Sequence, residues 1–322
     1  MKAPPRVVAL VESLHPDAVK LAQELFTAPA YQLLLSPAQN WRESAHAIVM
    51  RTGSLTREDI EAAKCLQVVG KQGVGLDKVD LSAAKEQGVI IRNTPGINAT
   101  AVAELVVAHI FAVARQIVDI GVRQRNGSVF QRHQCSGLQI TGKTIGIVGM
   151  GAIGKTVARM LHHGFGCTIF AYDPFLADDA WSDVPHTRAQ TVQEMLPLLD
   201  VLTLHVPLAD GTRNLISMTE FKAMKQSCIL INHSRGEHKH KTHYRGVVNE
   251  EDMVTALKEK KIWGVGIDAL VYDPPTLEKY GDLWSLPNVV TTPHIGASTP
   301  QTQSESACAA VLNVWEFFES NK

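Results

Sequence analysis

The sequence lacks a surplus of charge of either sign. Its 322 residues include 31 Lys and Arg against 32 Asp and Glu, which gives a formal net charge of −1. A protein that neutralises a nucleic-acid backbone or an anionic membrane surface needs a cluster of basic charge. We therefore expect no nucleic-acid partner and no membrane partner.

Cysteines are few and widely scattered. The five are Cys65, Cys135, Cys167, Cys228 and Cys308, and no two stand at the spacing of a metal or redox motif. An odd number of distant cysteines argues against both a disulfide framework and a zinc site. We expect reduced, mostly packed thiols and no bound metal.

Long apolar runs are also missing. No stretch approaches the roughly 20 apolar residues of a membrane-spanning helix. The apolar run at 7–11 is too short for the hydrophobic region of a secretory signal and has no cleavage site after it. These absences predict a cytoplasmic protein.

What is present is an alternation of short β-prone runs with helix-prone segments. This order is typical of a parallel sheet covered by helices on both faces. Strands are expected at 7–11, 47–50, 68–70 and 89–92, with helices at 16–26, 57–64 and 81–87, and a second series of strands at 144–148, 168–172, 201–205, 229–232, 264–268 and 289–292. The predicted fold class is α/β, with two doubly wound parallel-sheet domains of the Rossmann or flavodoxin-like kind and a cleft between them.

A segment that is apolar nearly all round, residues 101–120, predicts one long buried helix that joins the two domains. A last helix is expected at 304–318. We therefore expect residues 1–99 and 299–322 to form a discontinuous substrate-binding domain and residues 100–298 to form a nucleotide-binding domain. The apolar helix also predicts a subunit interface and hence a homodimer; the alternative is the central helix of a monomer.

A glycine-rich turn follows the expected strand at 144–148 and leads into a helix. Gly149 permits the tight turn, Gly151 lets the backbone approach a pyrophosphate, and Gly154 lets the helix pack on the strand. Asp173 ends the next strand, where a carboxylate accepts hydrogen bonds from ribose hydroxyls and repels a 2′-phosphate. The predicted cofactor is therefore NAD. The residues of the turn expected to bind it are Gly149, Gly151, Ala152, Ile153 and Gly154.

Three polar residues stand at the ends of later strands, where open α/β sheets bind their ligands. Arg235 offers a planar charged fork for a carboxylate and can polarise a neighbouring carbonyl. His294 can exchange a proton with the substrate oxygen, and Asp273 would stabilise the imidazolium. Alone, each residue is more often structural. Together, beside a dinucleotide turn, they predict a catalytic site.

Several segments occur together and in order: Gly73-Val74-Gly75-Leu76-Asp77, Asn93-Thr94-Pro95-Gly96, and Pro293-His294-Ile295-Gly296-Ala297. In these the sequence resembles the D-isomer-specific 2-hydroxyacid dehydrogenases, particularly the members like D-3-phosphoglycerate dehydrogenase. The resemblance covers nearly the whole chain. It implies an NAD-dependent oxidoreductase that acts on the CH–OH group of D-2-hydroxy acids or reduces their 2-oxo partners.

The resemblance also implies binding residues. Those near the cofactor would be Val74, Val206, Pro207, His233, Ser234, Asp268, Gly296 and Ala297, and those near the substrate Arg51, Lys71, Gln72, Gly73, Val74, Gly75 and Arg235. Arg51 and Lys71 match positions that hold a distal phosphate in phosphoglycerate dehydrogenases, although lysine lacks the fork of arginine. Solvated surface charges are the alternative. Phosphoglycerate or phosphohydroxypyruvate and hydroxypyruvate or glyoxylate therefore all stay open as substrates.

Asp273 departs from the pattern, because the family usually carries glutamate there. Aspartate is shorter by one methylene. Contact with His294 then requires either a closer backbone or a bridging water.

The larger departure is an insertion of nine residues, 237–245, between Gly236 and the helix start at 246–250. It either loops into solvent or distorts the site. Arg245-Gly246 imitates Arg235-Gly236, but we favour Arg235 because it comes directly after the strand at 229–232. The histidines His238, His240 and His243 predict a basic loop rather than a metal site, since no carboxylate or cysteine completes one; an error in the coding sequence is a further alternative. The insertion keeps open a second function, an NAD(H)-binding scaffold or corepressor-like protein without turnover.

Overall fold

The computed structural model describes residues 4–38, 40–177, 179–234, 236–237 and 245–320. The chain divides into two compact units. Unit 1 comprises Met1–Asn98 and Ser298–Lys322, and unit 2 comprises Ala99–Ala297.

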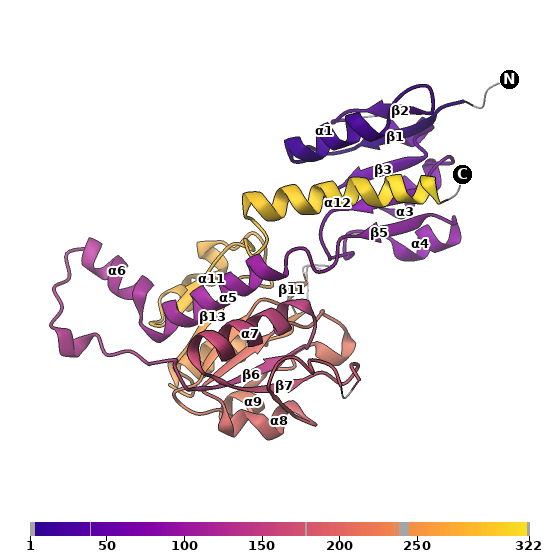
Figure 1. The fold of residues 1–322 in the computed structure, drawn as a ribbon. Coiled ribbons are helices and arrows are strands. Elements are labelled where there is room, and N and C mark those ends of the chain that lie inside the picture. The colour runs from indigo at the N-terminus through magenta and orange to yellow at the C-terminus, as the bar shows by residue number, and fades with distance from the viewer. Residues whose placement is uncertain (1–3, 39, 178, 235, 238–244, 321–322) are drawn as a thin grey trace. The chain divides into compact units, whose positions relative to one another are not determined.

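The described residues of unit 1 form a five-stranded parallel sheet in the order β2-β1-β3-β4-β5, which is the flavodoxin-like order (Figure 1). Its strands are β1 (Arg6–Leu10), β2 (Tyr31–Leu34), β3 (Ala47–Met50), β4 (Val68–Lys71) and β5 (Ile90–Asn93). Its helices are α1 (Pro16–Leu25), α2 (Trp41–Ser44), α3 (Arg57–Ala62), α4 (Leu81–Glu86) and α12 (Pro300–Glu319).

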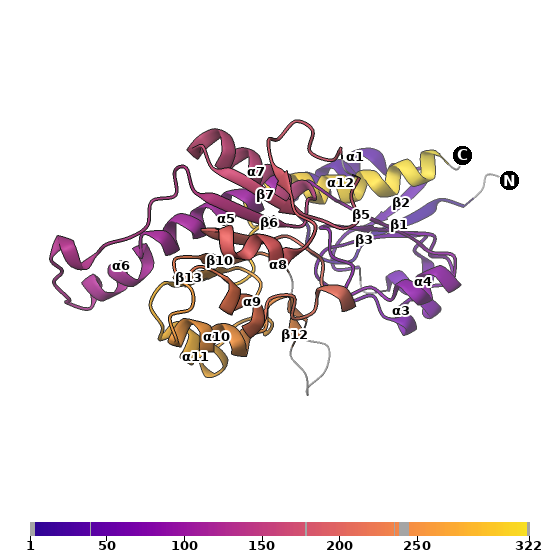
Figure 2. The same cartoon turned by 90° about the horizontal axis from the view of Figure 1, so that it is seen from below.

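Alternate residues of the strands feed two cores, one on each face of this sheet. Val8 and Leu10 pack with α1 and α12, whereas Ala9 packs on the face covered by α3 and α4 (Figure 2). Gly70 lets α12 lie directly on β4, since a Cβ there would be 2.2 Å from the carbonyl oxygen of Ala310. The end of β4, which leads into the predicted substrate loop, is therefore firmly held.

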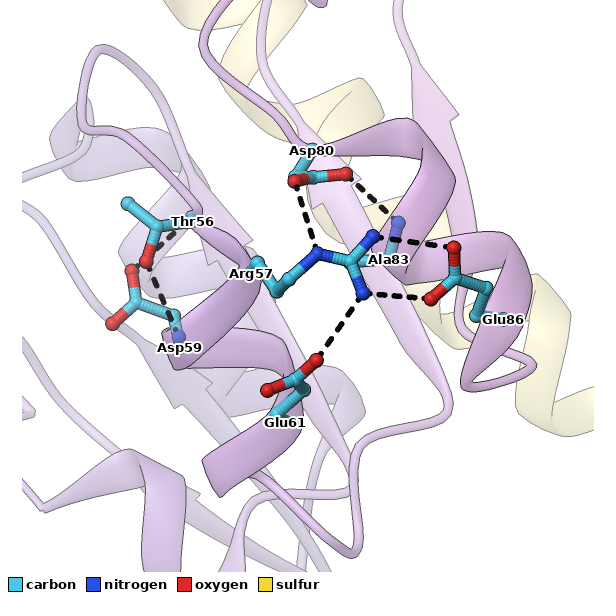
Figure 3. Close-up of polar contacts among 7 residues, drawn as sticks. All are labelled: Thr56, Arg57, Asp59, Glu61, Asp80, Ala83 and Glu86. Carbon is cyan, nitrogen blue, oxygen red and sulfur yellow. Dashed lines mark hydrogen bonds and ion pairs between the residues drawn. The ribbon is translucent and has the colours of Figure 1, made fainter.

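Side chains cap the helices α3 and α4 of unit 1 (Figure 3). The amide of Asp59 donates to the Thr56 hydroxyl at 3.3 Å, and the Asp59 carboxylate accepts from the Thr56 amide at 3.0 Å. The Asp80 carboxylate accepts from the Ala83 amide at 2.8 Å. The free amides at the first turns of these helices are thus satisfied by the chain itself.

The described residues of unit 2 form a seven-stranded parallel sheet in the order β14-β13-β10-β9-β6-β7-β8. Its strands are β6 (Thr144–Val148), β7 (Thr168–Tyr172), β8 (Thr187–Arg188), β9 (Val201–Leu204), β10 (Ile229–Asn232), β13 (Gly264–Ile267) and β14 (Val289–Thr291), with a separate ribbon of β11 (Gly236–Glu237) and β12 (Arg245–Gly246). Its helices are α5 (Ala99–Ala114), α6 (Ile117–Arg125), α7 (Ala152–Phe165), α8 (Val192–Met195), α9 (Met218–Ala223), α10 (Glu250–Lys258) and α11 (Leu277–Trp284).

The strand order reverses between β6 and β9, as in the Rossmann fold. One core lies between the sheet and α5 and α7, and the other lies on the face covered by α8 to α11 (Figure 2). Ligands of open α/β sheets bind at the carboxyl ends of the strands near such a reversal. The predicted α/β fold class with two doubly wound units is therefore confirmed.

The prediction of one helix over 101–120 is wrong. Helix α5 ends at Ala114, Gln116 takes a left-handed φ of 55°, and α6 begins at Ile117. The carbonyl of Ala114 accepts from the Leu138 amide at 2.8 Å, and the Gln116 side chain donates to the Ser136 carbonyl at 3.1 Å. A distant segment thus takes the Ala114 carbonyl that a continuing helix would have used, and a second bond from it holds the Gln116 side chain.

The bend between α5 and α6 also bears on membrane insertion. Among the described residues, no single helix is long and apolar enough to cross a membrane; α5 and α6, bent by 63°, pass on length and composition only when they are taken together. Nine residues of α5 are buried within unit 2.

The cysteines are unpaired. Cys167 and Cys228 are buried, Cys135 and Cys308 are partly buried, and Cys65 is exposed. Burial raises the pKa of the Cys228 thiol to about 12. This thiol is therefore an inert core residue.

Candidate active site

Glycines shape the turn between β6 and α7 in unit 2. Gly149 has a φ of 96°, and a Cβ there would lie 2.4 Å from the carbonyl oxygen of His205. Gly154 packs against the same turn, since its Cβ would lie 2.2 Å from the carbonyl oxygen of Gly149. A side chain at either position would push the helix away from the strands.

Among the described residues, no side chain caps the first turn of α7. Gly151 is the N-cap residue, makes no side-chain cap, and has open space where a Cβ would stand. The amides of the first turn, which includes Ala152 and Ile153, and the positive end of the helix dipole suit a pyrophosphate. The turn therefore fits a dinucleotide.

Asp173 follows β7 and braces this turn. Its Oδ2 accepts from the Met150 amide and its Oδ1 from the Phe175 amide, each at 3.0 Å. A carboxylate has about four acceptor positions, so two remain for ribose hydroxyls. Arg188 of β8 donates to the backbone carbonyls of Asp173 and Leu176. Its guanidinium thus holds the loop that follows β7.

Trp181 is a contact that the sequence prediction missed. Its Nε1 donates to the Met150 carbonyl at 2.7 Å, and the side chain is buried. The carbonyl and the amide of Met150 are therefore both fixed by side chains. A separation of 31 residues along the chain leaves no sequence signal for this contact.

The ends of β9 and β10 carry the predicted residues Val206, Pro207, His233 and Ser234. The amide of Val206 donates to the Ser234 hydroxyl at 3.2 Å, and the amide of Ser234 donates to Asn232 Oδ1 at 3.0 Å. These bonds tie the two strand ends together. His233 and Ser234 are both buried.

His294 and Asp273 are brought together. Nδ1 of His294 lies 3.2 Å from Oδ2 of Asp273, and the two side chains are 42% and 48% exposed. Of the two alternatives left open above, a direct contact is the one observed. The shorter carboxylate reaches the imidazole without a bridging water.

Asp268 holds the backbone that carries His294. Its Oδ1 accepts from the Ile295 amide and its Oδ2 from the Gly296 amide, each at 2.8 Å, while its carbonyl accepts from the His294 amide at 2.9 Å. His294 has a φ of 56°, a left-handed conformation that costs a non-glycine residue about 1 to 3 kcal/mol. Ala297, also predicted at the cofactor, follows this segment as the last residue of unit 2.

Three histidines of unit 2 lie in or beside the core; His109 and His233 are buried, and His205 is partly buried. Nε2 of His233 lies 3.0 Å from Nδ1 of His109, Nε2 of His109 lies 3.3 Å from the Thr292 hydroxyl, and Nε2 of His205 lies 2.9 Å from the Thr203 hydroxyl. Burial lowers the pKa of all three, to about 3 for His205. The prediction missed His109, whose only signal was a lone histidine in an apolar helix.

The predicted substrate loop 72–75 belongs to unit 1. Gly73 has a φ of 92°, and its amide donates to the Thr94 hydroxyl at 2.8 Å. Asn93 Nδ2 donates to the Val74 carbonyl at 2.8 Å. Among the described residues, the amides of Val74 and Gly75 donate to no group. These two amides of the loop therefore stay available for a carboxylate.

Gln72 has a packing role. It is buried, and its Nε2 donates to the Ser306 hydroxyl of α12 at 3.0 Å. The side chain thereby ties the loop to the helix that covers β4. The structure thus gives the Gln72 side chain a packing contact at the start of the loop that was predicted to bind substrate.

The two predicted phosphate-binding residues differ in exposure. Arg51 is exposed, whereas Lys71 is buried and its ammonium donates to the carbonyls of Arg51 and Gln72. Lys71 is therefore not the solvated charge that was one of the alternatives. It braces the two loops that follow β3 and β4.

An internal carboxylate occupies the backbone amides beside Arg51. Glu12 accepts from the amides of Arg51, Thr52 and Gly53 at 2.9 to 3.0 Å, and from the Thr52 hydroxyl at 2.9 Å. Burial raises the pKa of Glu12. The hydrogen bonds from the amides of Thr52, Gly53 and Arg51 together lower the pKa by more than burial raises it, so the pKa lies below the ordinary 4.5. The loop 51–53 thus binds an anion that the chain supplies.

The ends of the nine-residue insertion pair with each other. Gly236 of β11 is opposite Gly246 of β12 in an antiparallel ribbon, and the Asn214 amide donates to the Gly246 carbonyl at 2.9 Å. The insertion therefore leaves and rejoins the chain at one place, and α10 still begins at Glu250. Arg235, His238, His240 and His243 lie outside the described residues. The described parts of the chain contain no group of three or more His, Cys, Asp or Glu suited to a metal.

Comparisons with known proteins address the family. The sequence model of the D-isomer specific 2-hydroxyacid dehydrogenase NAD binding domain matches residues 107–296. The D-3-phosphoglycerate dehydrogenase of Methanocaldococcus jannaschii is 33% identical over 92% of this chain and 54% of its own length. The hydroxypyruvate reductase of Thermotoga maritima is 36% identical over 84% of this chain and 83% of its own length.

This chain belongs to the D-isomer-specific 2-hydroxyacid dehydrogenase family. Solved structures agree. A glyoxylate reductase from Paecilomyes thermophila superposes with a TM-score of 0.79, 26% identity, and coverage of 97% of this chain and 95% of that one. The chain spans about half the length of the phosphoglycerate dehydrogenases it matches. The predicted family and the NAD-binding domain are confirmed.

Proposed function

We propose that this chain catalyses the NAD-dependent interconversion of a D-2-hydroxy acid and its 2-oxo acid. The observation that carries the proposal is the contact between His294 and Asp273, at 3.2 Å. This pair lies in unit 2, which also contains the glycine turn before α7, where Gly151 makes no side-chain cap. In this proposal unit 2 binds NAD and unit 1 binds substrate.

The residues divide the work by their chemistry. Bound NAD supplies the acceptor or donor of the hydride. His294 exchanges a proton with the substrate oxygen through Nε2, because Asp273 accepts from Nδ1, fixes the tautomer and stabilises the imidazolium. Arg235 and the amides of Val74 and Gly75 bind the substrate carboxylate.

Oxidation of NADH with a panel of 2-oxo acids tests this function. The panel is hydroxypyruvate, glyoxylate and phosphohydroxypyruvate. We expect His294→Gln to lower kcat by about 10²-fold to 10⁴-fold, the usual contribution of a general acid. His133→Gln, which changes an exposed histidine, is the matched control. Equal activity of the two variants would refute the assignment.

The insertion favours a second candidate, an NAD(H)-binding scaffold without turnover. It begins two residues after Arg235, whose carboxylate-binding role the dehydrogenase needs. Binding of NADH with no oxidation by any acid of the panel would support the scaffold. Deletion of residues 237–245 tests whether the chain has no activity or an activity that the insertion blocks. The deletion can be closed because Gly236 and Gly246, on either side of it, are already paired. Activity gained on deletion would make the insertion inhibitory.

Within the dehydrogenase proposal, we favour a short substrate without a distal phosphate. The amides of 51–53 hold the Glu12 carboxylate, and the ammonium of Lys71 binds backbone carbonyls. Of the two residues predicted to bind a phosphate, Arg51 is the exposed one. We expect a higher kcat/KM for hydroxypyruvate or glyoxylate than for phosphohydroxypyruvate. The reverse order would restore the phosphorylated substrate.

The assembly and location follow as further proposals. Helix α6 exposes Ile117, Val118 and Val122, an apolar set that suits a subunit interface. We propose a homodimer, which light scattering on the purified chain tests. We also propose a cytoplasmic location, supported by the balanced charge and the free cysteines. Cell fractionation tests it.

A further inference from the structure

A line of hydrogen bonds connects four elements of unit 2. It runs from His233 at the end of β10 to His109 in α5, then to Thr292 after β14 and Asp268 after β13. The successive distances are 3.0, 3.3 and 2.6 Å. It ends at the amides of Ile295 and Gly296, both bound by Asp268. The line therefore leads from the core to the segment that carries His294.

The chemistry of these groups fixes the direction of each bond. A carboxylate only accepts, so the Thr292 hydroxyl donates to Asp268. The hydroxyl must then accept from Nε2–H of His109. Nδ1 of the neutral His109 is consequently an acceptor, and Nε2–H of His233 donates to it. Burial, which lowers the pKa of both histidines, supports their neutral state. In each hydrogen bond of the line, the donor is therefore the group farther from Asp268.

The end of the line is the strained part of the site. His294 holds a φ of 56°, and its amide donates to the carbonyls of Asp268 and Thr292 at 2.9 and 3.0 Å. Gly296 is pressed between Asp268 and α5, since a Cβ there would lie 3.0 Å from Oδ2 of Asp268 and 3.2 Å from Val102. A strained segment persists only where its surroundings determine it. Here the carboxylate of Asp268 does so.

We propose that His109 is a positioning residue: through Thr292 it orients the Asp268 carboxylate, which holds residues 294–296 in the conformation that brings His294 against Asp273. The proposal rests on the function proposed above for His294. His109 touches neither the reacting atoms nor Asp273. Its effect is exerted on the geometry of the site, which supporting residues determine in preorganised enzymes.

The matched pair Thr292→Val and Thr203→Val tests this role. Each removes one hydroxyl that bonds a histidine of unit 2, with little change of shape, but only Thr292 lies on the line. Hydrogen exchange followed by mass spectrometry reads the amides of 294–296 without reference to turnover. We expect faster exchange there in Thr292→Val and wild-type exchange in Thr203→Val. Equal exchange in the two variants would overturn the proposal.

Two replacements of His109 separate positioning from packing. Glutamine places its amide near Nε2 and keeps the Thr292 bond, whereas asparagine places its amide near Nδ1 and keeps only the His233 bond. We expect His109→Asn and Thr292→Val to lose about 10-fold to 100-fold in kcat, as misplacement of a catalytic group does, with His109→Gln close to wild type. Equal losses for glutamine and asparagine would show a packing role and overturn the proposal. If the wild-type chain reduces no acid of the panel, the function proposed for His294 fails, and the exchange experiment alone decides the positioning role.

Discussion

Two loops of this molecule gather backbone amides after a β-strand, and the chain uses them in opposite ways. In unit 1 the amides of 51–53 hold the carboxylate of Glu12. In unit 2 the amides at the start of α7 have no side-chain cap, and open space adjoins Gly151. The first loop carries its own anion, and the second is left for an anion from solution.

In the function proposed above, this difference leaves the start of α7 open to the pyrophosphate of NAD. Helices α3, α4, α10 and α12 receive a side-chain cap, whereas α2, α6, α7 and α11 do not. A side-chain cap stabilises a helix by about 0.5 to 2 kcal/mol relative to alanine, but by only a few tenths of a kcal/mol relative to a glycine such as Gly151. The start of α7 forgoes that gain. We attribute this to the pyrophosphate that a cap would exclude.

The largest expected effect is on the turn itself. Gly149→Ala adds a Cβ 2.4 Å from the His205 carbonyl at a φ of 96°, so the turn must move. We expect NADH affinity to fall by about 100-fold or more, equivalent to roughly 3 kcal/mol of strain. Titration calorimetry measures it. Gly164→Ala, also in the region of α7 but with open space at its Cβ, is the control. Near-normal NADH binding by Gly149→Ala would place the nucleotide elsewhere.

The next experiment makes the turn of unit 2 resemble the loop of unit 1. Gly151→Asp supplies the missing cap and an internal carboxylate, at a position with open space for it. We expect unfolding to require a few tenths of a kcal/mol more, while NADH affinity falls by about tenfold or more. Gly151→Asn caps without charge and separates repulsion from bulk. If the aspartate variant bound NADH as well as the wild type, the contrast between the two loops would have no functional meaning.

Local rules accounted for most of the fold and for the glycine turn. The strands at 47–50, 168–172 and 229–232 and the turn at 149–154 carry their own periodicity and glycine pattern, so they were predicted residue by residue. The break at Gln116 was missed because it depends on Leu138 and Ser136, which reach the helix end only in the folded chain. Strand β2 was missed because four residues with an embedded glutamine become a strand only beside β1.

In the candidate site, too, some features could be predicted from the sequence and others depend on contacts of the folded chain. Asp273 and His294 could be paired from the sequence, but their direct contact depends on the backbone at the ends of β13 and β14. The burial of Lys71 and the bonds of His109 could not be predicted, because each arises from elements far apart in the chain. Sequence patterns identify residues at strand ends; they do not show which polar groups are already satisfied by the fold.

A smaller effect is expected from the carboxylate in unit 1. The pKa of Glu12 is lowered on folding, so its stabilisation is present above pH 4.5 and is lost as the pH falls below that value. Glu12→Gln should therefore lower the free energy of unfolding at neutral pH by about 1 kcal/mol, with the difference vanishing in acid. Urea unfolding across this pH range measures it, with the exposed Glu24→Gln as control. A difference that persisted unchanged in acid would contradict the charge-based account.

Removing this carboxylate also sharpens the contrast between the loops. Glu12→Ala leaves the amides of 51–53 without their anion, as the amides of α7 are. We expect the ratio of kcat/KM for phosphohydroxypyruvate to that for hydroxypyruvate to rise in this variant. An unchanged ratio would mean that the loop is remote from the distal end of the substrate.

The smallest effect is expected from the exposed ion pairs at α3. Arg57 lies 2.6 Å from Glu86, 3.2 Å from Glu61 and 3.8 Å from Asp80 (Figure 3). Because these groups face solvent, salt screens their attraction. The screening length is about 3 Å at 1 M salt. Arg57→Gln should lower stability less than Thr56→Ala, which removes the cap of the same helix. The effect of Arg57→Gln should disappear in high salt, whereas the effect of Thr56→Ala should remain. Melting curves at low and high salt compare the two. The same salt dependence for both losses would mean that the cap, like the ion pairs, acts through screened charge. The contrast between filled and open amide sites would then rest on ligand binding alone.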